Sequence, residues 1–194
     1  DQIVLVFMHT ILIMPVTVAS IAGLIAIGRF KRDLENGTMD LISAHSISRL
    51  RLYAGYVGSG VLFTLGAWLA AIYSMFVAQA IVMPTPITIA KFNAVAVNAF
   101  PILLFFVGLA AILLGWLPKW YRLVYLVLGL NFYMLYLGKM LKMPEWLIQV
   151  MPSSWVAQAP LSAIDWGSWG IVLAIALALI GLSYLGYRQG DLMS

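Results

Sequence analysis

Few side chains in this sequence could carry chemistry, and their types exclude the commonest catalytic sites. There is no cysteine, so disulfides, thiolate metal sites and cysteine nucleophiles are excluded. The two histidines, His9 and His45, lie in separate segments, and the chain has no H-E-x-x-H metal motif. It also lacks the G-x-x-x-x-G-K-[ST] loop that cradles nucleotide phosphates. We therefore expect no catalytic residue, no metal site and no enzyme activity in this chain.

The most informative polar stretch is the charged segment at 29–51. Leu34, Leu41 and Ile42 recur at i, i+7 and i+8, which indicates a partly amphipathic helix with charges opposite its apolar stripe. Such a segment can dock into another protein or remain a solvated loop, and the residues alone favour neither. Arg29, Arg49 and Arg51 are expected to anchor it at the anionic inner membrane surface.

The composition shows what solvent surrounds the rest of the chain. Hydrophobic residues make up 63% of the 194 and charged residues only 9%, whereas an ordinary globular domain carries about 25% charged residues. A water-soluble fold would have too little polar surface to cover itself. The net charge of +4 is spread between apolar runs, so it indicates contact with membrane lipids and not with nucleic acid.

Five segments are long and apolar enough to be predicted as transmembrane helices. They cover about 3–28, 53–82, 92–117, 122–138 and 168–187. The runs show no alternation of apolar and polar residues, so a membrane barrel is not expected. The fold class is therefore all-α integral membrane, and 1–194 is interpreted as a single transmembrane domain that is a fragment or second half of a longer chain.

Charge and polarity along the spans predict the topology. Eight Lys and Arg residues fall on one side, including the 29–51 loop and the C-terminal end, against three on the other. This places the loop and the C-terminus in the cytoplasm and the N-terminus outside a plasma membrane. None of the seven acidic residues lies in the middle of a span, which argues against a proton- or sodium-coupled transporter.

The remaining polar features are interpreted as structural. Asn93, Asn98, Asn131 and Gln79 lie in or near spans, and hydrogen bonding between helices explains them better than a substrate site does. The external stretch at about 139–167 is rich in proline and aromatic residues and predicts a short interfacial helix or re-entrant segment. Pairs of small residues in the second span, such as Ala54 and Gly58, permit close helix approach.

Several motifs in order resemble those of a known family. They are the run Glu35-Asn36-Gly37-Thr38-Met39-Asp40-Leu41-Ile42-Ser43 with Ile47-Ser48-Arg49, then Gly115-Trp116-Leu117-Pro118, Met143-Pro144-Glu145-Trp146, Met151-Pro152-Ser153 and Tyr187-Arg188-Gln189-Gly190-Asp191-Leu192. Together they resemble permease subunits of type-two ABC exporters, in particular the polyketide or tetronasin-type antibiotic exporters. Ser46 stands where that family usually has proline.

The resemblance implies a six-span permease unit of which this chain lacks the first span. It also implies that residues 31–46 form a cytoplasmic coupling helix in a groove of a separate ATP-binding cassette subunit. The residues expected to dock there are Arg32, Glu35, Gly37, Thr38 and Asp40. ATP and Mg would be bound by that partner, with no cofactor in this chain, and a second permease half or copy would complete the pathway.

The function expected from these features is export of an amphiphilic compound (antibiotic, drug or lipid-like) driven by ATP hydrolysis in the separate subunit. The substrate-contacting residues are unknown. A non-transporting membrane scaffold or assembly subunit has the same spans and stays an alternative. A membrane-embedded enzyme acting on lipids is less favoured, because it would need polar residues gathered at one depth of the membrane.

Overall fold

The computed structural model describes residues 2–36, 49–83, 86–138, 141–157, 159 and 162–189, and within these ranges the chain is helical with no strand. The α-helices are α1 (Gln2–Glu35), α3 (Arg49–Val82), α4 (Ile89–Trp116), α5 (Leu123–Leu137), α6 (Glu145–Gln149) and α7 (Trp166–Gln189). Two short 3-10 helices, η1 (Pro118–Trp120) and η2 (Pro152–Trp155), lie in the connections. The predicted all-α membrane fold is confirmed.

Four of these helices are long and apolar enough to cross a membrane. The qualifying stretches are Thr10–Arg29, Leu50–Val82, Ile89–Trp116 and Trp166–Arg188. They match the first, second, third and fifth predicted spans. The fourth predicted span differs: α5 has 15 residues, which at the usual rise of a helix is about 22 Å and shorter than a bilayer core of about 30 Å.

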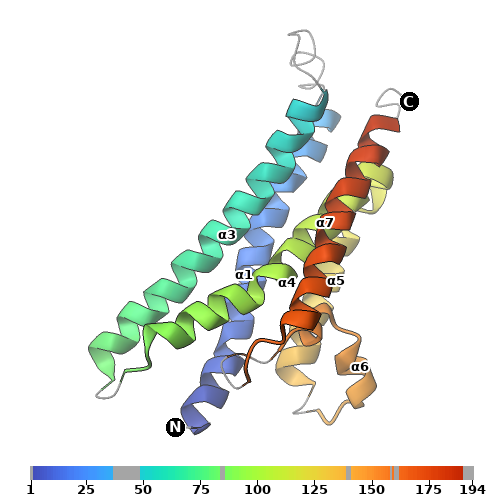
Figure 1. Ribbon diagram of the computed structural model, residues 1–194. Helices are drawn as coiled ribbons and strands as arrows, with labels where there is room; N and C mark the ends of the chain where they lie inside the picture. The colour runs from blue at the N-terminus through green and yellow to red at the C-terminus, as the bar shows by residue number, and fades with distance from the viewer. Residues whose placement is uncertain are drawn as a thin grey trace.

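The long helices form two pairs that cross each other, an antiparallel pair of α1 with α3 and a parallel pair of α4 with α7 (Figure 1). α1 packs along α3, and α4 packs most extensively along α7. Glycines permit both close approaches. A Cβ on Gly23 of α1 would lie 2.8 Å from the backbone oxygen of Gly60 in α3, and a Cβ on Gly115 of α4 would lie 2.4 Å from that of Ser183 in α7. Gly58, singled out in the second span, does not serve this purpose, since a Cβ there would meet no atom within 4 Å.

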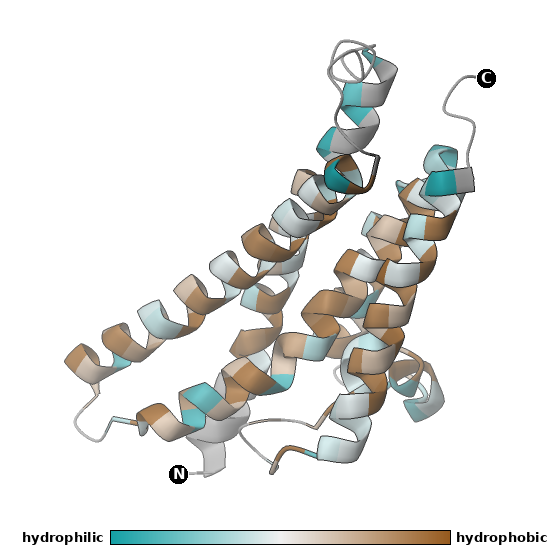
Figure 2. Ribbon diagram, turned by 45° about the horizontal axis from the view of Figure 1, so that its top comes forward, coloured by the Kyte–Doolittle hydropathy of each residue, from teal (hydrophilic) through white to brown (hydrophobic). Residues whose placement is uncertain are grey.

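α4 forms the centre of the bundle, and α3 forms one of its outer faces. Two thirds (67%) of the most apolar part of α4 is buried, against 17% for α3. Large apolar side chains on α3, among them Leu62 and Ile81, are 73% and 79% exposed. Figure 2 shows hydrophobic residues along the whole length of the helices. An outward apolar face of this extent is what lipid contact requires.

The two ends of the bundle differ in charge. One end of the bundle, which we call the basic end, contains the last turns of α1 and α7, the first turn of α3, and η1 (Figure 1). Exposed cations at this end are Arg29, Arg32, Arg51, Lys119, Arg122 and Arg188. The opposite end, which we call the α6 end, carries α6, η2 and the start of α7 (Figure 1). The basic side predicted from the loops is therefore one end of the folded molecule.

Candidate functional site

The predicted coupling residues begin where α1 ends. Arg32 and Glu35 belong to the last turn of α1, which continues beyond the predicted end of the first span at residue 28. Gly37, Thr38 and Asp40 lie outside the described residues, as does most of the predicted coupling helix. Of the predicted anchoring residues, Arg29 and Arg51 are exposed at the basic end.

Arg49, the remaining anchoring residue, is the first residue of α3. The two helix ends that carry the predicted anchors therefore lie on either side of residues 37–48, which the structure does not describe. The predicted coupling segment and the roles of its residues stay predictions.

A hydrogen bond ties the end of α1 to α3. The Tyr56 hydroxyl donates to Oδ2 of Asp33 over 2.7 Å, and both side chains are half-buried. This bond joins the last turn of α1 to the N-terminal part of α3.

A second tyrosine links α3 to α7. The Tyr53 hydroxyl donates to the backbone carbonyl of Ile180 over 2.6 Å and is also hydrogen-bonded to the Ser183 hydroxyl. The Tyr53 ring stacks on Tyr187 with 5.6 Å between ring centroids. The first turns of α3 are thus held to the last turns of α7.

A third tyrosine links the turn between α4 and α5 to α1. Tyr121 is buried, and its hydroxyl donates to the backbone carbonyl of Leu24. The pKa of the Tyr121 phenol is raised, mainly by burial and to a lesser extent by the neighbouring Tyr125. This hydroxyl is therefore protonated and able to donate at physiological pH. We call Tyr53, Tyr56 and Tyr121 the tyrosine ties. None of the three was predicted from the sequence as a residue that links helices, although a tyrosine at the end of an apolar run is a signal that could have indicated them.

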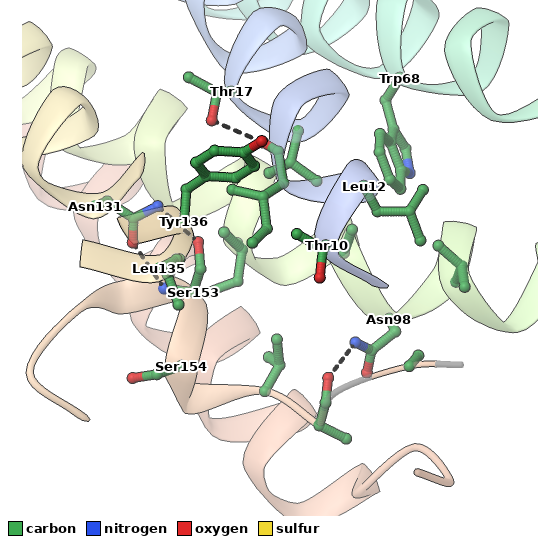
Figure 3. A pocket seen from close by; sticks show the side chains of 18 of the residues that line it. Thr10, Leu12, Thr17, Trp68, Asn98, Asn131, Leu135, Tyr136, Ser153 and Ser154 are labelled. Atoms are coloured by element: carbon green, nitrogen blue, oxygen red, sulfur yellow. Dashed lines mark hydrogen bonds between the residues drawn. The ribbon is translucent and has the colours of Figure 1, made fainter. Parts of the chain in front are cut away.

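The α6 end contains a cavity of about 340 Å³ between α1, α4, α5 and the segment from α6 to residue 159. Figure 3 shows side chains from these elements around it. Its lining includes Thr10, Leu12, Ile13, Val16, Thr17, Trp68, Val95, Asn98, Ala99, Ile102, Asn131, Leu135, Tyr136, Ile148, Ser153, Ser154, Val156, Ala157 and Ala159. This volume lies within the range of small-molecule pockets, about 300–1,000 Å³.

Two of the asparagines that the sequence analysis singled out form part of this cavity. The Asn131 amide donates to the Ser153 hydroxyl over 2.9 Å, and its oxygen accepts the Ser153 backbone N–H over 3.1 Å. The Asn98 amide donates to the backbone carbonyl of Ala157 over 2.7 Å. Both therefore hold the segment after α6 against the long helices (Figure 3).

The other two polar residues hold helices together at the same end. Asn93 accepts the Tyr73 hydroxyl over 2.9 Å, joining α4 to α3. The Gln79 side chain bonds both the N–H and the carbonyl of Ile87, over 2.7 and 3.0 Å, and so closes the turn between α3 and α4. All four residues make hydrogen bonds, but only Asn93 joins two long helices, so the predicted bonding between long helices is confirmed for Asn93 alone.

The described lining of the cavity is uncharged. No Lys, Arg, His, Asp or Glu is among the described residues that line it. Nor does the described part of the chain bring three His, Asp or Glu side chains together in a way that could hold a metal ion. What the lining offers is apolar surface with a few hydroxyl and amide groups, the composition of a site for an amphiphilic molecule.

A comparison with known families agrees with this arrangement. Residues 1–188 match the family described as "Multidrug efflux system permease Rv1217c, C-terminal domain". The chain belongs to this family. It is therefore a membrane protein of the permease type, with a role in transport. No curated protein matches the sequence. The expected resemblance to exporter permeases is confirmed at this level, and the tetronasin-type subgroup stays a prediction.

Proposed function

We propose that this chain is the membrane-spanning component of an ATP-driven exporter of the ABC type and moves an amphiphilic compound across the plasma membrane. ATP and Mg would be bound by a separate ATP-binding cassette subunit. The observation that carries the proposal is the match of residues 1–188 to a multidrug efflux permease family. The apolar bundle, with a charged segment at one end and a cavity at the other, supports it.

The coupling step would begin at the basic end. Residues 31–46, with Arg32, Glu35, Gly37, Thr38 and Asp40, are proposed to dock into the ATP-binding subunit. ATP shifts a conformational equilibrium only if it binds the two states differently, and docking would pass that difference to the end of α1. The bond between Tyr56 and Asp33 and those of Tyr53 then offer a route to α3 and α7.

Charge supports the proposed orientation. The exposed cations of the basic end favour the cytoplasmic side, where anionic lipids attract them. The α6 end would then face outward. A second copy or half, packed on the exposed apolar surface, would complete the pathway in this proposal, and a further span would precede the chain.

The proposal is tested by purifying the complete transporter from its native membrane in mild detergent and identifying the proteins that accompany it by mass spectrometry. The expected companion carries a G-x-x-x-x-G-K-[ST] loop. Glu35→Arg should abolish substrate-stimulated ATPase activity and weaken this association. Glu145→Arg makes the same charge change at an exposed position of the α6 end and should leave both unchanged.

Two results would overturn the proposal. The first is that no ATP-binding protein accompanies the chain in any of several detergents, which would favour the scaffold interpretation. The second is that Glu35→Arg and Glu145→Arg have equal effects, which would remove the coupling role from residues 31–46.

A further inference from the structure

Asn98, which lines the cavity at the α6 end, has a buried oxygen that no described residue bonds. Asn98 is only 7% exposed, and its Oδ1 accepts no hydrogen bond from any described residue. The orientation of the amide is fixed by chemistry, because the Ala157 carbonyl can only accept and the Asn98 nitrogen must face it. A buried acceptor left unpaired is unfavourable, so a donor on a bound ligand that reaches this oxygen would be favoured.

Other buried polar groups show why Asn98 stands apart. The indole N–H of Trp68, in the same lining, donates to the Ala96 carbonyl over 3.2 Å. Thr64 Oγ1 also lacks a described partner, but a Cβ on Gly23 would lie 1.7 Å from it. Thr64 is thus closed in by the packing of α1 on α3, whereas Asn98 borders a cavity (Figure 3).

The lining also restricts the charge of the ligand. No charged side chain is among the described residues of the lining, and an ion buried without a counter-charge is strongly unfavourable. Leu12, Ile102 and Leu135 supply apolar surface, which favours a hydrocarbon body. The best fit is a neutral molecule with an apolar body and one hydrogen-bond donor.

We propose that this cavity is a binding site for a neutral amphiphile whose hydroxyl or amide N–H donates to Oδ1 of Asn98. The proposal rests on the proposed export function only for the claim that such a molecule is cargo. Binding itself needs no ATP and no partner subunit, and can be tested separately.

The test uses two photoreactive probes, a diazirine-bearing octanol and its methyl ether, on the complete transporter in lipid nanodiscs, with labelled peptides mapped by mass spectrometry. The alcohol should label the cavity lining, for example near Ile148 and Val156. It should do so roughly 3- to 10-fold more strongly than the ether, the ratio expected from one net hydrogen bond.

Three variants sharpen the test. Asn98→Leu should remove the preference for the alcohol. Ala99→Leu leaves the Asn98 bond intact and fills part of the cavity, so it should reduce labelling by both probes. Asn93→Leu is the control, because Asn93 is on the same helix but is exposed and does not line the cavity.

Equal labelling by alcohol and ether in the unmodified protein would overturn the proposal, as would a preference that survives Asn98→Leu. Labelling of the exposed face of α3 alone would mean that the probes only partition into lipid, and would also overturn it. None of these results depends on ATPase coupling. Failure of this site is thus distinguishable from failure of the export proposal, which Glu35→Arg tests.

Discussion

The basic end and the α6 end are made from the same apolar helices, yet their polar groups act differently. At the basic end, the hydroxyls of Tyr53, Tyr56 and Tyr121 each reach a neighbouring helix and close the gap between them. At the α6 end, Asn98 and Asn131 hold a separate segment across the bundle and leave a cavity of about 340 Å³ beneath it. Hydrogen bonds hold the helices together at the basic end, whereas the α6 end encloses a cavity.

In the proposed function, this difference assigns coupling to the basic end and cargo binding to the α6 end. In that function, a signal from a partner subunit would need helices that move together, and the hydrogen bonds of the tyrosine ties would couple them. A cargo site needs space and a few polar groups that are not fully used, which the α6 end provides.

The largest effect is expected where α4 and α7 touch near the basic end. In Gly115→Val the new Cβ would lie 2.4 Å from the Ser183 backbone oxygen, a conflict that no side-chain rotation relieves. We expect the free energy of unfolding to fall by about 3 kcal/mol, measured by titration with denaturing detergent. Gly181→Val is the control, since a Cβ there meets no atom within 4 Å. Equal stability of the two variants would contradict the close contact between α4 and α7 at Gly115.

At the α6 end, Asn131→Leu should loosen the segment after α6 without disturbing the opposite end. It removes both bonds to Ser153 and leaves the Ser153 backbone N–H unpaired, at a cost of about 2 kcal/mol. Hydrogen exchange should become faster at 145–155 and stay unchanged at 50–60. Faster exchange at both ends would show that the ends are not separate.

At the basic end, Tyr56→Phe removes the bond to Asp33 and retains the ring. We expect a stability loss of about 1 kcal/mol, a lower substrate-stimulated ATPase rate in the complete transporter, and unchanged labelling of the cavity. Tyr73→Phe deletes the same hydroxyl from an exposed tyrosine bonded to Asn93 and should retain the ATPase rate. An unchanged rate in Tyr56→Phe would remove Asp33 and Tyr56 from the coupling route.

The smallest effect concerns Asp165 at the start of α7. The Ser168 hydroxyl donates to its carboxylate over 2.6 Å and the Gly167 N–H over 3.1 Å, and these bonds lower its pKa from the ordinary 3.8. The stabilising effect is therefore present above pH 3.8 and is lost as the pH falls through the lowered value. The Gly167 amide resonance should titrate with a midpoint below 3.8, and Asp165→Asn should abolish that titration. A midpoint at or above 3.8 would contradict the hydrogen bonds from Ser168 and Gly167 to the Asp165 carboxylate.

Apolar length predicted the four long helices because a span must satisfy its own backbone in lipid. The count of Lys and Arg predicted a basic side because charges gather at helix ends. The fourth predicted span, 122–138, agrees with α5 to within one residue at each end, but the 15 residues of α5 are fewer than the roughly 20 that a membrane crossing needs. Segment length is therefore a good guide to most of the fold.

The sites were less predictable, because they join residues that are far apart in sequence. Tyr53 and Ile180 are 127 positions apart, and Asn98 and Ala157 are 59 apart. A single sequence shows each of these as one polar residue in an apolar run. It indicates that such a residue needs a partner, but not which partner, nor that a cavity remains beside it. The asparagines were thus identified as hydrogen-bonding groups while the cavity was missed.

The most direct test of the account asks whether ATP at the basic end changes the cavity at the α6 end. The diazirine-bearing octanol would be applied to the complete transporter in nanodiscs, with and without ATP and vanadate, in the unmodified protein and in Glu35→Arg. We predict that ATP with vanadate changes labelling near Ile148 and Val156 in the unmodified protein and leaves it constant in Glu35→Arg. Labelling of the unmodified protein that does not change with ATP and vanadate, while the ATP-binding subunit is still attached, would contradict coupling between the two ends.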